Sequence, residues 1–283
     1  MNEFLASAYT ESVHRLALGL EPLDALRGGR LAHPVRVELE RPLPRHLANP
    51  TDPYRRPVRP GDVHARVNRH DSALHVLLYH PSLADHVDLR IYDHVRRYVP
   101  RRFRLPLLSQ EVAESQPYTH RVRRPVLFPG AAYDVSERAT GLRGRVLRSD
   151  KPMRWARIEA WLPDTETLVG RAQGDDRGEF LLLLAPGAAP ASEFTGRDLE
   201  VRVDVFGPET PPAPIPTDLP DQDPFWDLSL ELAPTPGEDD PVSAGGSRPE
   251  GYVAAASASR IVSFRLGRLR TGIEEENFVF TLP

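Results

Sequence analysis

The sequence lacks cysteine altogether and has a single lysine, Lys151, among its 283 residues. The missing cysteines exclude a disulfide framework and a thiolate metal site. No apolar run reaches the roughly 18 residues that a membrane-spanning helix needs, and no basic segment followed by an apolar one marks a secretory signal. We therefore expect no membrane span and assembly in the cytoplasm, with later release as part of a larger particle left open.

Linear signatures of catalysis are also missing. The chain has no G-x-S-x-G nucleophile elbow, no phosphate-binding P-loop and no H-E-x-x-H helix. Acidic pairs can serve as the acid and base of a glycosidase, and the pairs here are Asp175 with Asp176, Asp221 with Asp223, and Asp239 with Asp240. Each pair lies in a predicted turn or loop, where aspartate is favoured for local hydrogen bonding. We expect a protein that is not an enzyme and has neither catalytic residues nor a cofactor.

Histidines are concentrated in the first half of the chain, and all ten precede residue 121. Five of them fall between residues 70 and 94: His70, His75, His80, His86 and His94. Metal ligands usually recur at i, i+2 on a strand or at i, i+4 on a helix, and these spacings fit neither pattern. We interpret the histidines as structural or surface residues and expect no metal site.

The chain is rich in proline and arginine. Its thirty prolines favour strands joined by rigid loops, because proline is costly within helices and central strands. The net charge of -4 gives no global electrostatic reason to bind nucleic acid, and we expect no such partner. Arginine supplies almost all the positive charge. This has two interpretations: a GC-rich coding sequence, or selection of the planar guanidinium for protein contacts.

The stretch of residues 141–184 carries the clearest pattern in the chain. Residues 155–161 alternate between two faces, as in a β-strand. The sequence Asp-Asp-Arg-Gly at residues 175–178 separates two strand-like runs. It predicts a β-hairpin with a type I turn that ends on a glycine at positive φ.

Three motifs in this stretch follow one another as G-x-V, P-x-x-x-A-x-I and D-x-x-G-x-F, at residues 144–146, 152–158 and 175–180. This order resembles the carboxypeptidase regulatory-like domain, a small transthyretin-like β-sandwich. The resemblance covers about a third of the chain. It implies a scaffolding module and says almost nothing about chemistry.

Short alternating segments recur through the rest of the chain, separated by turn residues and without helical patterns between them. Such spacing argues for antiparallel sheets. The predicted strands outside the stretch 141–184 are residues 34–40, 62–67, 72–79, 86–93, 101–108, 198–206, 225–232, 260–266 and 278–282. Residues 42–61, 208–224 and 233–251 have the composition of long loops.

We predict a mainly β fold of two β-sandwich-like domains of immunoglobulin or transthyretin type, with long proline-rich loops. Residues 1–30 form an N-terminal helix or arm, and residues 31–117 form an N-terminal β domain. Residues 118–283 form the regulatory-like domain with a C-terminal strand extension, entered through a linker at 116–124. The predicted helix occupies residues 1–20, because five of its apolar residues fall close to one helical face: Leu5, Tyr9, Val13, Leu16 and Leu20. It packs on its own domain or docks on a neighbouring subunit.

The run of residues 90–107 interleaves arginines with aromatic side chains. Such a composition can bind single-stranded nucleic acid, but the acidic chain argues against it. Arginine and tyrosine are also favoured at protein interfaces, and the remaining interpretation is a solvated face of two amphipathic strands. The candidate protein interface comprises Arg90, Tyr92, Arg96, Arg97, Tyr98, Arg101, Arg102 and Arg104.

The pattern R-R-x-V-P-R-R-x-R-x-P-L at residues 96–107, with the layout of the whole chain, is similar to proteins encoded beside contractile phage-tail-like particles and extracellular contractile injection systems. This resemblance implies a structural component that assembles in several copies on a tail, baseplate or cap. The expected partners are other subunits of the particle, including further copies of this chain.

Two other functions stay open. The first is a carbohydrate- or surface-binding module that uses Trp155, Trp161 and Trp226 as aromatic platforms. Trp155 and Trp161 share a predicted face, on which they can stack sugars or fill a core. The second is a hydrolase, because convergent catalytic sites leave no linear trace.

Overall fold

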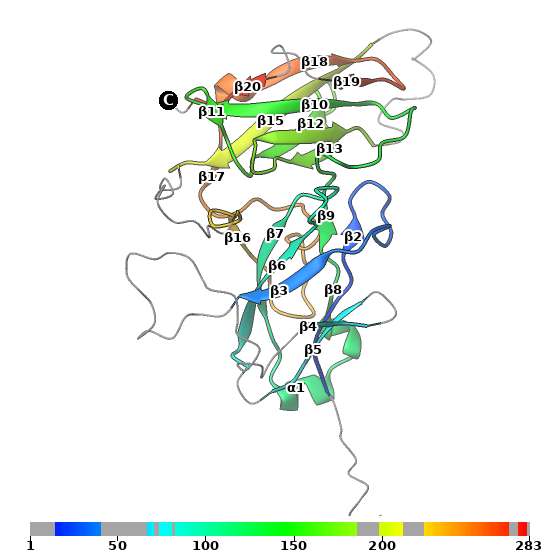
Figure 1. Cartoon of the computed structure of the whole chain (residues 1–283), viewed down its shortest axis with the longest axis vertical. Helices are drawn as coiled ribbons and strands as arrows, with labels where there is room; N and C mark the ends of the chain where they lie inside the picture. The colour runs from blue at the N-terminus through cyan, green and yellow to red at the C-terminus, as the bar shows by residue number, and fades with distance from the viewer. Residues whose placement is uncertain are drawn as a thin grey trace, which may run out of the picture.

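The structure is a computed structural model that describes residues 15–40, 67–70, 74–80, 83–185, 198–211, 224–271 and 277–281. Within these ranges the chain forms twenty short strands, one α-helix of six residues and two 3₁₀ turns (Figure 1). The expectation of a mainly β fold is confirmed. The predicted loop at 42–61 and nearly all of the predicted strand at 62–67 lie outside the described residues.

Two five-stranded sheets form what we call the C-terminal unit, at the top of Figure 1. In one sheet β10 pairs with β11, β14, β19 and β20; in the other the order is β13-β12-β15-β17, with β18 also on β15. The strands are β10 (Gly141–Arg148), β11 (Lys151–Pro152), β12 (Arg157–Leu162), β13 (Thr167–Gln173), β14 (Glu179–Leu183), β15 (Leu199–Pro208), β17 (Tyr252–Ala254), β18 (Arg260–Phe264), β19 (Leu269–Thr271) and β20 (Asn277–Val279).

Alternation along the strands builds the core between these two sheets. On β15, Val201, Val203 and Val205 are each at most 1% exposed and face residues of the opposite sheet such as Phe180 and Phe278. The last two rings meet edge to face with centroids 5.6 Å apart, a favoured aromatic geometry. Because successive strand residues point to opposite faces, every second residue of β15 supplies the core.

The predicted hairpin at residues 175–178 is wrong, although its turn chemistry is right. Gly178 has φ +72, and Asp175 Oδ1 accepts hydrogen bonds from the N–H groups of Arg177 and Glu179. The flanking strands do not pair with each other, however: β13 belongs to one sheet and β14 to the other. The turn therefore carries the chain across the core from sheet to sheet.

The apolar run that begins in β14 explains this crossing. Phe180, Leu182 and Leu184 belong to the core of the C-terminal unit, whereas Leu181 and Leu183 belong to a second core below it. Both faces of the run are thus covered. Burial of an apolar side chain stabilises by roughly 1.5 to 3 kcal/mol, so a strand with two apolar faces favours a place between two cores over a solvated hairpin.

The second core belongs to what we call the N-terminal unit, formed by the sheets β16-β7-β6-β3 and β4-β5-β1-β8 with a two-stranded pair, β2-β9. Its members include Leu18, Leu89, Ile91 and Phe103, all nearly inaccessible to solvent. The strands are β1 (Leu16–Leu20), β2 (Leu23–Asp24), β3 (Arg36–Glu40), β4 (Val67–Arg69), β5 (His75–Leu78), β6 (His86–Tyr92), β7 (Arg101–Pro106), β8 (Val122–Arg123), β9 (Val126–Leu127) and β16 (Leu230–Leu232).

The helix predicted for residues 1–20 is wrong where the structure tests it. Residues 16–20 form β1, which pairs with β5 on one side and β8 on the other. Ala17, Leu18 and Leu20 are all buried there. Consecutive buried apolar residues suit a central strand, which is covered on both faces, better than the single stripe of an amphipathic helix. Residues 1–14 lie outside the described part of the chain.

The helix that does form, α1 (Gln110–Ser115), was not predicted. The Ser109 hydroxyl caps it by accepting a hydrogen bond from the N–H of Val112 at 3.3 Å, a standard N-cap arrangement. Only Ala113 is buried, so the segment shows almost no helical periodicity. The expected linker at 116–124 instead contains a 3₁₀ turn, Tyr118–Arg121, and β8.

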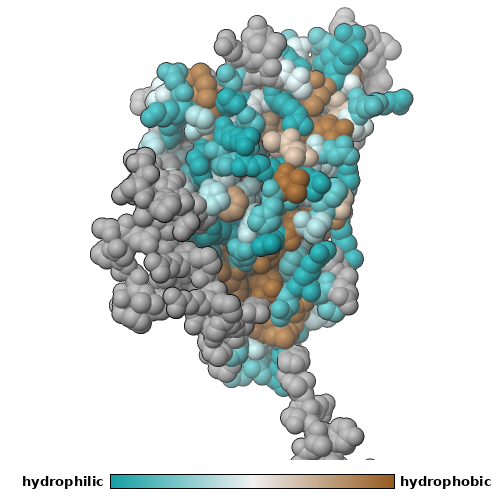
Figure 2. Space-filling model, viewed as in Figure 1, coloured by the Kyte–Doolittle hydropathy of each residue, from teal (hydrophilic) through white to brown (hydrophobic). Residues whose placement is uncertain are grey.

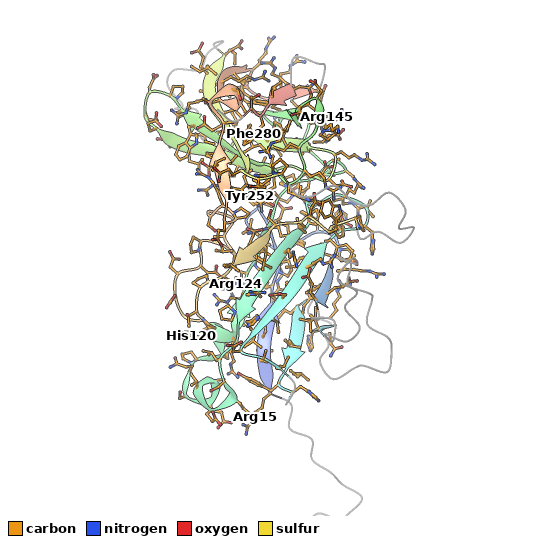
Figure 3. The ribbon with its side chains drawn as sticks, turned by 90° about the vertical axis from the view of Figure 1, so that its left-hand side faces the viewer. Arg15, His120, Arg124, Arg145, Tyr252 and Phe280 are labelled. Carbon is orange, nitrogen blue, oxygen red and sulfur yellow. The ribbon has the colours of Figure 1, made fainter. Side chains whose placement is uncertain are left out.

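Strands from beyond residue 117 complete the N-terminal unit. β8 adds in parallel to β1, β9 to β2, and β16 to β7. Residues 233–251, expected to be a flexible loop, fold back as turns, and Ser243 is 4% exposed. Within the C-terminal unit, the Tyr252 hydroxyl (Figure 3) donates a hydrogen bond to the Trp155 carbonyl at 2.9 Å.

Candidate functional site

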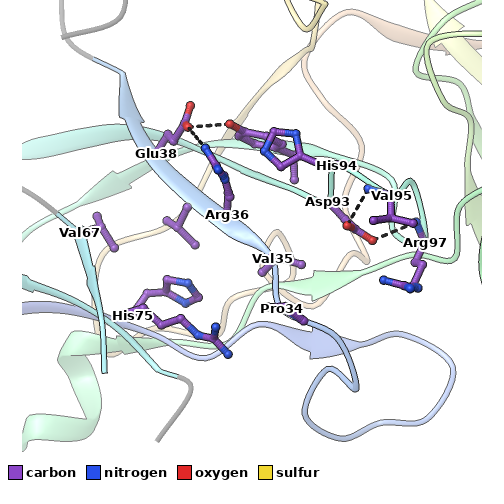
Figure 4. Close-up of a pocket in the computed structure, with 13 residues that line it drawn as sticks. Pro34, Val35, Arg36, Glu38, Val67, His75, Asp93, His94, Val95 and Arg97 are labelled. Atoms are coloured by element: carbon purple, nitrogen blue, oxygen red, sulfur yellow. Dashed lines mark hydrogen bonds and ion pairs between the residues drawn. The ribbon is translucent and has the colours of Figure 1, made fainter. Parts of the chain in front are cut away.

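The best candidate for a binding site is a cavity of about 520 Å³ in the N-terminal unit (Figure 4). Its walls come from β3, β4, β5 and the turn after β6. On the face that Figure 2 shows, hydrophobic residues gather over this unit, whereas the C-terminal unit is mostly hydrophilic. The cavity lies within the roughly 300–1,000 Å³ range of small-molecule sites. It is lined by Pro34, Val35, Arg36, Val37, Glu38, Val67, Arg69, His75, Tyr92, Asp93, His94, Val95 and Arg97.

His75 is the buried polar group of this cavity. Its side chain extends from β5 toward Val35 (Figure 4) and is 6% exposed. Burial lowers the pKa of His75, the charge of Arg69 lowers it further, and a hydrogen bond to the Val35 carbonyl opposes both. The ring is therefore neutral at pH 7. Its Nδ1 atom is buried without a hydrogen-bond partner, which typically costs about 1–3 kcal/mol.

A hydrogen-bonded pair closes one wall of the cavity. The Tyr92 hydroxyl donates to Glu38 Oε1 at 2.6 Å, and burial together with that bond raises the pKa of Tyr92 to about 12. Arg36 Nη1 lies 4.0 Å from the same carboxylate oxygen. The ring of His94 meets Tyr92 edge to face, with centroids 5.0 Å apart. The wall thus presents both an aromatic surface and polar groups.

The turn after β6 is organised by Asp93. Its two carboxylate oxygens accept hydrogen bonds from the N–H groups of Val95 and Arg97, at 2.9 and 3.0 Å. Arg96 between them has φ +63, a conformation that non-glycine residues adopt rarely. Its guanidinium forms two bonds to Asp176, at 2.6 and 3.0 Å, which hold the turn against the C-terminal unit.

The eight predicted interface residues do not lie on one exposed face. Tyr92, Tyr98 and Arg101 are at most 8% exposed, so they contact this chain's own interior. Most of the others form ion pairs within the chain: Arg90 and Arg102 with Glu40, Arg104 with Asp88, and Arg96 with Asp176. The interface stays a prediction for the residues that reach the surface.

Arg101 takes part in a buried ion network that sequence reasoning missed. Its guanidinium donates to both carboxylate oxygens of Glu231 at 3.0 and 2.6 Å. Arg157 Nη2 donates to the same carboxylate at 3.0 Å. All three side chains are at most 7% exposed. Arg101 comes from the N-terminal unit and Arg157 from the C-terminal unit, so the carboxylate of Glu231 links the two units through an ion pair with each.

A second buried polar cluster surrounds Asp24. Its Oδ2 atom accepts hydrogen bonds from the hydroxyls of Tyr98 and Tyr133 at 2.9 and 2.8 Å. Its Oδ1 atom accepts from the N–H groups of Leu26 and Arg27. Burial, followed by the bond to Asp24, raises the pKa of Tyr98 to about 12. Asp24 is fully satisfied by these four bonds, so the cluster anchors the turn after β2.

The acidic pairs that were weighed as catalytic have local partners. Asp175 forms the turn described above, and Asp176 pairs with Arg96. Asp240 binds Arg123 at 2.9 Å and caps the N–H of Ser243. Asp221 and Asp223 lie outside the described residues. Among the residues that the structure describes, no three His, Asp or Glu side chains group as metal ligands.

The tryptophans do not form a shared platform. Trp155 is 2% exposed, and its indole N–H donates to Asp227 at 2.7 Å. Trp155 also precedes β12, with φ +60, so the alternation that links it to Trp161 is broken between them. Trp226 has a buried indole nitrogen without a partner. Sugar stacking on Trp155 would require the interior to open.

No known protein family, no curated protein and no solved structure matches this chain. In the described part of the chain, the one α-helix is six residues long, too short to cross a membrane.

Proposed function

We propose that the chain is a non-enzymatic structural subunit of a contractile phage-tail-like particle, where it contacts further copies of itself and other subunits in a tail, baseplate or cap. In this proposal the two units are β-sandwich-like domains, and the C-terminal one is of the carboxypeptidase regulatory-like type. The three motifs of that resemblance fall on β10, on the entry to β12 and on the turn before β14, which supports the assignment.

The observation that carries the proposal is a surface at one side of the C-terminal unit, formed by β18 and β20, which we call the C-terminal edge. In the described part of the chain, β18 pairs with β15 alone and β20 with β10 alone. The two strands are neighbours, because Arg260 stacks on the ring of Phe278 at 3.9 Å. Unpaired strand edges can accept a strand from another chain.

Each strand of this edge also carries an exposed apolar side chain, on the outer face of its own sheet. Ile261 is 59% exposed and Val279 is 50% exposed, although strand residues of this type are usually buried. Exposure of these side chains does not stabilise a monomer, whereas assembly would remove their apolar surface from water. The buried ion network keeps the N-terminal unit in a fixed position relative to this edge, which suits a part that must hold several contacts at once.

The test is assembly of the full-length chain in the organism that encodes it. Wild-type protein should co-purify with particle components, and Ile261→Arg with Val279→Arg should abolish co-purification while leaving the circular dichroism spectrum unchanged. Val112→Arg, at a valine of α1 that is 45% exposed, is the control and should behave as wild type. Particles that lack this chain, together with an isolated protein that stays monomeric and captures no particle component, would refute the proposal.

A further inference from the structure

A second cavity lies where the two units meet, and the proposed function does not use it. Its volume is about 270 Å³, close to the lower end of the range for small-molecule sites. Its walls come from β13 and β14 of the C-terminal unit and from β9 and the turn after β2 of the N-terminal unit. Figure 1 shows β2 and β9 directly below β13. Junctions between two units of a chain are common places for a small ligand to bind.

Apolar side chains form almost all of this cavity. Among the described residues that line it, Arg171 is the only one with a polar side chain. Leu183, also in the lining, belongs to the core of the N-terminal unit, so one wall is firmly packed. Leu26, Val126 and Leu168 are partly exposed, and a ligand that covered them would remove apolar surface from water. The body of a ligand that fits this cavity is therefore apolar.

Arg171 supplies an accessible charge beside these apolar walls. Its side chain is 36% exposed, and the Glu159 carboxylate lies 3.9 Å from its Nε atom. That carboxylate already accepts a hydrogen bond from Arg248 at 2.7 Å. In the described part of the chain, the Arg171 guanidinium donates no hydrogen bond. Its two terminal nitrogens lie beside Gly246, 3.8 and 3.9 Å from the position that a Cβ would take there. The guanidinium is thus next to the turns of residues 241–246, which carry Ala244 of the cavity lining.

We infer that this cavity binds a small apolar carboxylate, an acid with a short alkyl chain or one aromatic ring. The carboxylate would bind Arg171, because a guanidinium matches it through two parallel hydrogen bonds. The apolar body would cover Leu26, Val126 and Leu168. A phosphate dianion fits less well, since one guanidinium would leave its second charge unpaired beside apolar walls, which is costly.

Binding is measured on the full chain by isothermal titration at pH 7, where octanoate is ionised. Three further probes separate the contributions of chain and charge: octan-1-ol, hexanoate and acetate. We expect octanoate to bind. Octan-1-ol keeps the chain but lacks the charge, so it should bind at least about tenfold more weakly. Hexanoate should lose about fourfold in affinity for each methylene removed, and acetate should not bind measurably.

Two variants test the assigned groups. Arg171→Gln should weaken octanoate binding about tenfold or more and leave octan-1-ol binding unchanged, because only the carboxylate uses the guanidinium. Arg145→Gln, at an arginine that is 46% exposed and does not line the cavity, is the matched control. Ala244→Trp should block the cavity and weaken both probes; since Ala244 is exposed, the larger side chain leaves the core intact. Ala256→Trp, at another exposed alanine, should change neither affinity.

The inference fails if octanoate does not bind, or if octan-1-ol binds as tightly as octanoate. It also fails if Arg171→Gln affects the two probes equally, or if Ala244→Trp leaves the octanoate affinity unchanged. Loss of co-purification with particle components in Ala244→Trp, without octanoate binding to the wild type, would assign the cavity to an apolar side chain of a partner subunit instead. None of the titrations depends on assembly at the C-terminal edge, so the proposed function and this binding site can fail separately.

Discussion

Arg101 and Glu231 form a two-bond ion pair in the interior, 3.0 Å from Nε to Oε1 and 2.6 Å from Nη2 to Oε2. Arg101 is fully inaccessible to solvent and Glu231 is 2% exposed. Three carbonyl oxygens, of Val126, Val242 and Ser243, accept the remaining guanidinium N–H groups. Such a buried pair is expensive to break, because removal of one partner leaves the other charge uncompensated.

Glu231→Gln should therefore destabilise the protein by about 3–5 kcal/mol, measured by urea unfolding. Glu179→Gln is the matched control, since that carboxylate binds Arg145 at the surface and should contribute less than about 1 kcal/mol. Replacement of the whole network by Arg101→Met, Arg157→Met and Glu231→Leu should recover much of the loss. Equal effects of the two glutamine variants would contradict the importance of the network.

The same carboxylate predicts acid sensitivity. Burial raises the pKa of Glu231, but the charges of Arg101 and Arg157 outweigh burial and hold the pKa below its ordinary value of 4.5. A group with a lowered pKa in the folded state stabilises it above the unfolded-state pKa. That contribution is lost as the pH falls from about 4.5 through the folded-state value. Unfolding free energies measured from pH 7 down to pH 3 should show a fall that is smaller in Glu231→Gln.

Tyr133→Phe should destabilise the turn after β2. The variant removes one of the two hydroxyls that donate to Asp24 Oδ2, and a buried carboxylate that loses a donor typically costs about 1–3 kcal/mol. Tyr118→Phe is the control, since Tyr118 is 67% exposed and its loss should leave the melting temperature unchanged. An unchanged melting temperature for Tyr133→Phe would show that the second hydroxyl is dispensable.

Gly178→Ala should destabilise more than Gly251→Ala, although both residues have φ near +70. The left-handed conformation costs each alanine about 1–2 kcal/mol. At Gly178 the added Cβ would also lie 2.6 Å from the Val146 carbonyl oxygen, whereas at Gly251 it meets open space. Thermal unfolding of the two variants provides the comparison. Equal losses would mean that the turn between the sheets shifts freely.

Local chemistry was readable from the sequence. The alternation of Val201, Val203 and Val205 predicted a strand with one buried face, and β15 is that strand. The aspartate and glycine of residues 175–178 predicted a turn with a left-handed glycine, and Gly178 adopts it. These features depend on side-chain periodicity and backbone sterics within a few residues, and neighbours in space do not alter them.

The sequence could not show which segments would meet. The same turn joins two sheets instead of closing a hairpin, because β14 is apolar on both faces and lies between two cores. Leu16 and Leu20 fit a helical stripe, yet pairing with β5 and β8 places them in a strand. Arg101 and Tyr98 resembled surface residues until β16 and Asp24 supplied their partners. Contacts over such separations depend on packing of the whole chain, so only the tertiary structure decided which arginines remain exposed and where the cavity lies.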